Sequence, residues 1–339
     1  MKKPQGAINT RIAGDKLLKI SIPFILAVAC IGALPLSATA QAAYPEKPIR
    51  IVVPFAAGGV TDALLRLLQE PVGRTLGQPV VVENKPGAAG AIAARYVAES
   101  PADGYTFLVV NTGLVAITPF AQKNAGFDPQ KSFVPVAGLS SAPSVLLIHP
   151  SVPADNVGQF IAYAKANPGK IDYAVVGKGA YGDLATALFS RQAGIRMTPV
   201  PYQGNAQTTT ALMTGEVKAQ LTILSGAMNE YIRNGKIKAL GVATAAPTPL
   251  IPGVAPIAES VPGFDAVVFT GLLAPARTSP AIVQKVGQAV TSALADSALK
   301  AKLVAMGMEA APLGGAAYAE RISNEVRSFA PMVKELATE

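Results

Sequence analysis

The chain has few of the residues that carry redox, nucleophilic or acid–base chemistry. Among its 339 residues are one cysteine, one histidine and no tryptophan. Cys30 lies in an apolar N-terminal stretch, so the rest of the chain cannot form a disulfide, a thiolate metal site or a cysteine nucleophile. His149 precedes Pro150 at the end of an apolar run, which favours a loop residue over a general base. No His, Asp and Glu residues cluster at metal-ligand spacing, so the sequence predicts no enzyme, no metal and no cofactor.

Charge of either sign is also scarce, at 15% of residues. The formal net charge is +8, but residues 1–40 hold five of the 29 basic and one of the 21 acidic residues, which leaves 24 basic and 20 acidic residues beyond them. A mild, dispersed excess without a basic stripe interleaved with aromatics excludes nucleic acid as the expected partner. With 50% hydrophobic residues, the chain is expected to fold around well-buried cores.

The first forty residues have the pattern of an export signal. Five basic residues precede an apolar run from Ile20 to Leu36, and small residues ending in Ala38-Thr39-Ala40 follow it. We expect cleavage after Ala40 or Ala42. Proline and glycine interruptions weigh against a signal anchor, and the apolar residues after Cys30 weigh against a lipid anchor there.

The central stretch of the sequence runs from Ile49 to Leu65. A β-branched run predicts a buried strand, Gly58 and Gly59 predict a tight turn, and Thr61 and Asp62 open an amphipathic helix. The first N–H groups of a helix have no intrahelical acceptor and favour negative charge. We interpret this loop as a seat for a small anion; a tight turn without a ligand is the alternative. It lacks both nucleotide-binding glycine patterns.

Strands and helices then alternate, which predicts a parallel sheet. Val80 to Glu83 and Tyr105 to Val110 are the second and third expected strands. In open sheets of this kind the order is commonly second, first, third, with the crevice between the first and third strands. That order places Asn111, Thr112 and Gly113 beside the anion seat, and gives the loop from Gly87 to Gly90 an architectural role.

A second series of strands and helices begins at Ser144 and continues to Thr244. Two of its loops, 177–183 and 201–205, repeat the glycine-bearing turn that opens a helix. A late strand, Ala266 to Pro275, is placed to return to the first lobe, and the two crossings would form a hinge. The expected fold is α/β, with two doubly wound lobes joined by a two-stranded hinge.

Several motifs, in order along the chain, resemble those of the Bug family, the periplasmic solute-binding proteins of tripartite tricarboxylate transporters. They are YPEKPIR (44–50), VPFAAGG (53–59) with Asp62, GQPVVVENKPG (77–87), DGY (103–105), VPYQG (200–204) and GLLAP (271–275). The resemblance covers essentially the whole chain beyond the signal segment. It implies a type II periplasmic binding protein that closes on a small carboxylate and delivers it to membrane permease subunits.

The resemblance also implies the boundaries and the site. Residues 44–142 and 264–339 would form lobe 1, residues 143–263 lobe 2, and the protein would be a periplasmic monomer. Backbone groups and water, rather than an arginine, would hold the carboxylate. The expected ligand-binding residues are Phe55, Ala56, Ala57, Gly58, Gly59, Asp62, Asn111, Thr112, Gly177, Gly179, Ala180, Asp183, Tyr202, Gln203 and Gly204. Of these, Tyr202 is expected to serve lobe packing more than ligand stacking.

Three departures from the family pattern bear on the ligand. Gly179-Ala180 and Asp183 stand where a Gly-Thr pair and a histidine are usual, Phe269 stands where tryptophan is typical, and the arginine usual near Ala246 is absent. Asp183 could repel a second carboxylate or pair with an ammonium group, which would shift the expected ligand from dicarboxylates towards amino-acid-like acids or uncharged amides. A periplasmic sensor subunit that feeds a two-component receptor is the alternative function, and a hydrolase or transferase on the same scaffold is a third.

Overall fold

The computed structural model describes residues 44–177, 179–224 and 226–336. The expected signal segment, its cleavage position and Cys30 lie outside the described residues. Within the described part of the chain, no helix combines the length and the apolar composition that crossing a bilayer requires.

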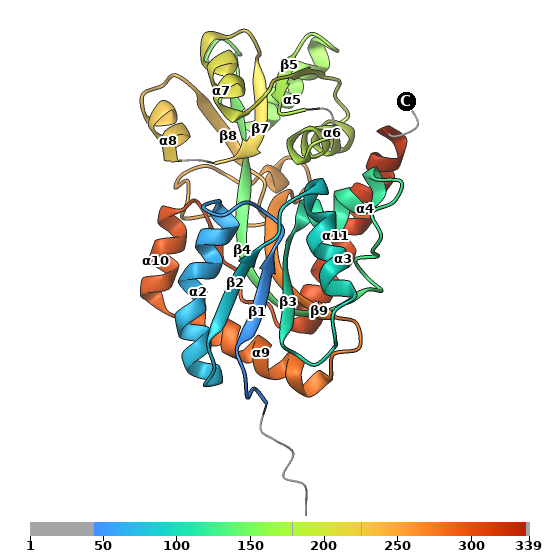
Figure 1. Cartoon of the computed structure of the whole chain (residues 1–339). Helices are drawn as coiled ribbons and strands as arrows, with labels where there is room; N and C mark the ends of the chain where they lie inside the picture. Colours follow the sequence, from blue (N-terminus) through green and yellow to red (C-terminus); the bar gives the residue numbers. More distant parts are fainter. Residues whose placement is uncertain (1–43, 178, 225, 337–339) are drawn as a thin grey trace, which may run out of the picture. The chain divides into compact units, whose positions relative to one another are not determined.

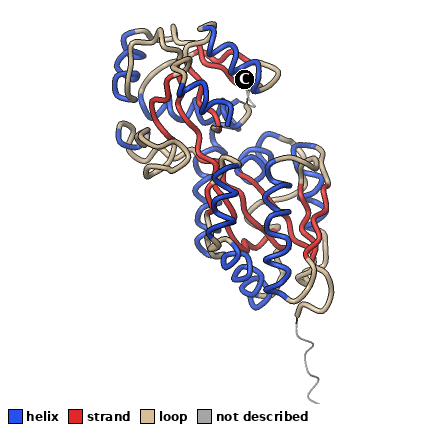
Figure 2. The backbone as a smooth tube through the Cα atoms, turned by 90° about the vertical axis from the view of Figure 1, so that its left-hand side faces the viewer, coloured by secondary structure: helices blue, strands red, loops and turns tan. Residues whose placement is uncertain are grey.

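The first sheet is organised around β1 (Ile49–Val53), and its strand order is β2-β1-β3-β9-β4. β2 (Val80–Asn84) and β3 (Thr106–Asn111) pair with β1 in parallel, so the predicted order of second, first, third is confirmed. Helices cover both faces of this sheet (Figure 2). Ile51 faces α2 (Val60–Leu76) and α9 (Pro280–Ala293), whereas Val52 faces α3 (Ala91–Ala98). Burial on both faces explains the nearly continuous apolar run of β1.

The expected return of the chain to the first lobe is confirmed. β9 (Val267–Pro275) lies between β3 and β4 and is antiparallel to both. The chain then forms α9, α10 (Ser297–Ala305), the short strand β10 (Glu309–Ala310) and the terminal helix α11 (Gly315–Leu336). α10 and β10 were not predicted. α10 is short and largely exposed, so its sequence carries little apolar periodicity.

A single long strand, β4 (Phe133–Ile148), connects the two sheets (Figure 1). Its first part, to Pro143, pairs with β9, and its second part, from Ser144, pairs with β7 and β8. The prediction that this strand begins at Ser144 was wrong by eleven residues. Pro135 and Gly138 lie in the missed part, where the register with β9 shifts twice, so the pattern there does not resemble a regular strand.

The second sheet contains β5 (Asp172–Val175), β6 (Thr198–Pro201), β7 (Ala219–Ile223) and β8 (Lys238–Val242). β6 and β7 pair with β5 in parallel, and β7 and β8 are antiparallel to β4. The helices of this part are α5 (Val157–Ala166), α6 (Tyr181–Ala193), α7 (Asn205–Thr214) and α8 (Gly226–Arg233). The fold class is therefore as predicted: two α/β lobes joined by a hinge.

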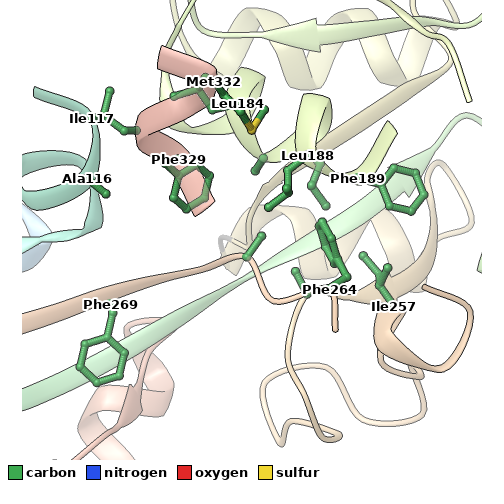
Figure 3. Packing of buried hydrophobic residues seen from close by; sticks show 14 of the residues in the cluster. Ala116, Ile117, Leu184, Leu188, Phe189, Ile257, Phe264, Phe269, Phe329 and Met332 are labelled. Carbon is green, nitrogen blue, oxygen red and sulfur yellow. The ribbon is translucent and has the colours of Figure 1, made fainter. Parts of the chain in front are cut away.

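Buried apolar side chains continue from one lobe to the other along α11. Phe329 and Met332 of α11 lie near Leu184 and Leu188 of α6, and Phe189 packs edge-on against Phe264 (Figure 3). The remaining short elements are the 3-10 turns Ala88–Gly90 and Ile257–Glu259, the π-helical turn Gly113–Ile117, and α4 (Thr118–Ala121).

Candidate functional site

The strand directions bring the predicted ligand loops of both lobes to one region. β3 runs in the same direction as β4, because both are antiparallel to β9, and β1 is parallel to β3. β5, β6 and β7 run in the opposite direction to β4. The carboxyl ends of β1 and β3 therefore point towards the second sheet, and those of β5 and β6 point towards the first. Both sets of ends approach the middle of β4, where it changes sheets.

The loop after β1 is exposed from Ala56 to Gly59 and half-buried at Phe55. Gly58 has a φ of 82°, the left-handed region that glycine adopts at little cost, and Gly59 is the N-cap of α2. No side chain caps this helix. The first N–H groups of α2 therefore remain available to an acceptor outside the helix.

Asp62 shapes this loop from inside. It is 2% exposed, and its carboxylate accepts hydrogen bonds from Gly58 N (3.0 Å), Arg66 Nε (2.8 Å) and Asn84 Nδ2 (2.9 Å). The bonds from Arg66 and Gly58 outweigh burial and lower the pKa of Asp62 to about 2. Both oxygens of the ionised carboxylate thus accept hydrogen bonds from the protein itself. Because Gly58 N–H donates to Asp62, it is not available to a ligand.

The start of α6 repeats this arrangement in the second lobe. Gly179 has a φ of 75°, Ala180 is an N-cap without a side-chain hydrogen bond, and Gly177 is also left-handed. Asp183 is 5% exposed and accepts from Gly179 N (2.9 Å) and Tyr173 Oη (2.8 Å). Burial and the neighbouring Asp183 raise the pKa of Tyr173, which keeps it a donor. Asp183 therefore faces its own loop and not open solvent, unlike the cleft acid that the sequence suggested.

The start of α7 shows the same geometry with an uncharged side chain. Gly204 is a bare N-cap, and Gln207 Oε1 accepts from Gln203 N at 2.9 Å. The Tyr202 phenol donates to Glu216 at 2.8 Å, and burial together with Glu216 raises the pKa of Tyr202 to about 12. Tyr202 also packs against the buried cluster of this lobe, as a structural residue would.

The loop after β3 combines an accessible and an inaccessible residue. Asn111 is half-buried and accepts from Leu114 N at 3.0 Å, which closes the turn around Gly113. Thr112 is 0% exposed, and its hydroxyl bonds to Glu325 and to Phe269 N. The Thr112 side chain cannot touch a ligand in this conformation, so any contact from Thr112 must come from its backbone.

Helix capping separates the predicted site from the periphery. Three helices elsewhere have N-cap side chains that accept a backbone N–H: Asn156 for α5, Ser279 for α9 and Asp296 for α10. α2, α6 and α7, whose starts lie at the strand ends described above, have none. α3 is also bare, but Leu114 and Pro54 pack against Gly90 there. The one-turn α4 is uncapped as well. Among the helices of nine or more residues whose N-cap is described, the uncapped starts are those of α2, α6 and α7, where the two lobes meet.

The side chains of these loops offer little positive charge or metal-binding capacity. No Lys or Arg occurs in residues 55–62, 111–113 or 201–205, and Arg66 is paired with Asp62. The loop 177–183 contains Lys178, which the sequence suggests as a solvated side chain or as a contact for a ligand carboxylate, and which lies outside the described residues. Across the described ranges, no three His, Cys, Asp or Glu residues lie together as a metal site would need. His149 bonds to Ser151 beyond the end of β4, away from the loops. The arrangement can bind an anion through amide N–H groups, and the described residues of these loops present no nucleophile with a partnered base.

Sequence reasoning missed the residues that hold the loops in shape. Asn84 donates both to Asp62 and to the Phe55 carbonyl (3.1 Å). It is the last residue of β2, one position beyond the predicted strand, and the sequence has no local signal of this contact. Arg66 and Gln207 could have been found, because each stands at helical spacing from the group it serves. Glu325, on α11, had no sequence signal linking it to Thr112.

Comparison with known proteins gives one consistent family. The family model described as tripartite tricarboxylate transporter family receptor matches residues 64–338. A UPF0065 protein of Bordetella pertussis is 36% identical over 78% of this chain and 82% of its own length. Protein BugT of the same organism is 32% identical over 86% and 90%, respectively.

Solved structures agree with this family. An R. palustris protein with adipate is 32% identical, with a TM-score of 0.67, over 87% of this chain and 98% of its own. MatC from Rhodopseudomonas palustris with bound malate is 31% identical, with a TM-score of 0.64, over 86% and 100%. A TctC solute-binding protein from Polaromonas without ligand is 26% identical, with a TM-score of 0.77, over 86% and 99%.

Proposed function

Because the chain belongs to the tripartite tricarboxylate transporter receptor family, we propose that it binds a small dicarboxylate in the periplasm and presents it to membrane permease subunits. Solved relatives are periplasmic or TctC solute-binding proteins and not enzymes. The resemblance drawn from the sequence motifs is thereby confirmed at the level of the family.

The observation that carries the proposal is the uncapped start of α2, α6 and α7 where the two lobes meet. Each bare start can donate N–H groups to a carboxylate oxygen, and the helix dipole favours negative charge there. One carboxylate would lie at Gly59 and Asn111 of lobe 1. The other would lie at Ala180 and Gly204 of lobe 2, with water completing the contacts.

The class of ligand follows from two points. Malate and adipate, bound by two structural relatives, are dicarboxylates of different length. In this chain Asp183 is buried, and its carboxylate oxygens accept hydrogen bonds from Gly179 N and Tyr173 Oη, so they are turned to their own loop and need no ammonium group on the ligand as a partner. A second carboxylate at α6 is therefore compatible with Asp183.

The proposal includes the lobe boundaries and the route of the protein. We assign residues 44–142 and 264–339 to lobe 1 and residues 143–263 to lobe 2; the change of pairing partner between Pro143 and Ser144 supports the first boundary. Residues 1–40 would direct export, and the mature protein would act as a monomer.

The test is to identify the natural ligand and then measure its affinity. Native mass spectrometry of the purified protein should show a small organic acid that dissociates on unfolding. Isothermal titration calorimetry with that acid, malate, adipate and glutamine should show binding of the dicarboxylates and no binding of glutamine, which carries an amide in place of the second carboxylate. Binding of glutamine in preference to every dicarboxylate, or chemical conversion of the bound acid, would contradict the proposal.

A further inference from the structure

Glu325 is a buried carboxylate that the proposed binding site does not use. It lies on α11, is 5% exposed, and its Oε1 accepts from Thr112 Oγ1 (3.0 Å) and from Arg321 Nε (3.0 Å). Burying a charge is costly unless it is paired and hydrogen-bonded. A chain retains such a group at some expense in stability, so its contacts need an explanation.

The contacts of Glu325 lead to the ligand loop in one direction. Thr112 follows β3 within the loop 111–113, and its hydroxyl also accepts from Phe269 N of β9 at 2.9 Å. A single oxygen atom of Thr112 thus joins the ligand loop to β9 and to α11. Replacing this oxygen would break both links while leaving the backbone N–H groups of the loop in place.

In the other direction the contacts lead to the hinge. Arg321 pairs with Asp265, which lies just before β9 where the chain crosses back from the second lobe. Ala266 N bonds to Ala243 O, and Ala243 N bonds to Ser144 O of β4, so this crossing is tied to the other one. A pocket of about 280 Å³, lined by Leu188 and Gln192 of α6 as well as by this ion network, lies between the lobes here.

The structure leads us to infer that Glu325 is a positioning residue. It fastens the ligand loop 111–113 to the hinge segment 265–269, so that binding at the loop and rotation at the hinge are coupled. The measurement of ligand affinity rests on the proposed function. The coupling between loop and hinge can be measured in the protein without ligand.

If Glu325 couples the loop to the hinge, its protonation should change ligand affinity. A residue that acted only through packing would show no such pH dependence. Burial raises the pKa of Glu325 to about 7, although Arg321 and Thr112 favour its ionised form. The charged and titratable groups facing it are Arg321 on α11, Asp265 at the crossing, Tyr181 on α6 and Tyr318 on α11. The pKa values of both tyrosines lie well above 10, so neither titrates near neutral pH.

The test is a double-mutant cycle with Thr112→Val and Glu325→Gln, read by hydrogen exchange of the unliganded protein. Glu325 does not touch the Phe269 amide, yet Glu325→Gln should speed exchange there and at 111–114 by about tenfold, the factor that about 1.4 kcal/mol of coupling gives. The double variant should match Thr112→Val alone. Glu320→Gln, an exposed charge removal on the same helix, should change neither segment.

A second test of the coupling measures ligand affinity at two pH values. Wild-type affinity for the co-purified acid should fall about tenfold from pH 8 to pH 6 as Glu325 becomes protonated, whereas Glu325→Gln should bind weakly at both pH values. Additive exchange effects, or an effect of Glu325→Gln confined to α11, would overturn the coupling. If the wild type binds no acid at all, the proposed function fails while the exchange cycle still decides this inference.

Discussion

At the scale of single residues, Gly59 is the position where ligand binding and helix stability can be separated. Its φ of −75° suits any residue, and an added Cβ would meet only the Ala56 carbonyl, at 3.4 Å. Gly59→Ser should place a capping hydroxyl on the N–H groups that the ligand needs. We expect affinity to fall about tenfold to hundredfold, the loss of one charge-assisted hydrogen bond, while stability stays unchanged or rises by a few tenths of a kcal/mol.

Gly59→Ala is the matched control, because alanine adds the same Cβ without a capping oxygen. It should bind within about threefold of wild type and should lose up to about 1 kcal/mol of stability, since alanine is a poor N-cap. Calorimetry and urea unfolding of both variants measure the two effects. If the serine variant binds as tightly as the alanine variant, the start of α2 does not hold the carboxylate.

Two buried carboxylates should give the stability of the protein opposite pH dependences. The folded-state pKa of Glu325, about 7, lies above its ordinary value of 4.5, so the folded state holds an extra proton between these pH values. Its contribution is full below pH 4.5 and is lost as pH rises to about 7, on the order of 3 kcal/mol. The pKa of Asp62 is lowered from 3.8 to about 2, so its contribution is full above 3.8 and is lost as pH falls through 2.

Urea unfolding across pH 2 to 8 tests this pair. The free energy of unfolding should be greatest near pH 4 to 5 and should decline towards neutral pH in the wild type. In Glu325→Gln the decline in the free energy of unfolding between pH 4.5 and 7 should disappear. The loss of stability below pH 3.8, which we assign to Asp62, should persist. A decline of equal size in the glutamine variant would assign the dependence to another group.

At the scale of secondary structure elements, α11 depends on a glycine in β9. A Cβ on Gly271 would lie 2.1 Å from the ring of Tyr318, which is fully buried against β9. Gly271→Ala should therefore cost at least about 2 kcal/mol, as overpacking forces α11 away from the sheet. Gly158→Ala in α5 meets only ordinary contacts and should be neutral or stabilising. Urea unfolding compares them, and equal stability of the two variants would show that α11 shifts freely.

Elements with a regular apolar period were predictable, and those shaped by distant contacts were not. β1 was predicted because burial on both faces leaves a continuous β-branched run in the sequence. α6 begins at Tyr181, within the stretch 177–183 that was predicted to be a loop, because Asp183 accepts from Gly179 N at the start of the helix. The sequence does not distinguish a buried acidic residue that accepts a hydrogen bond from the backbone from an exposed acidic residue in a loop. The same limit applies to Thr112, whose neighbours Glu325 and Phe269 are far along the chain.

At the scale of the whole molecule, the question is whether ligand draws the lobes together. The described structure is more similar to the ligand-free Polaromonas protein, with a TM-score of 0.77, than to the adipate-bound or malate-bound proteins, although those are more identical in sequence. We expect a ligand that contacts both lobes to shift the population towards a state in which the lobes lie closer together.

The shift can be measured directly, because residues beyond the predicted cleavage position contain no cysteine and two can be added without interference. Glu70→Cys on α2 and Thr210→Cys on α7 are exposed positions on different lobes, outside the proposed ligand contacts. Spin labels at these sites should give a shorter mean distance when the co-purified acid is added. The same pair combined with Gly59→Ser should keep the long distance at ligand concentrations that saturate the wild type. A distance that does not respond to saturating ligand in the wild type would mean that binding proceeds without closure, and the hinge would then have no part in recognition.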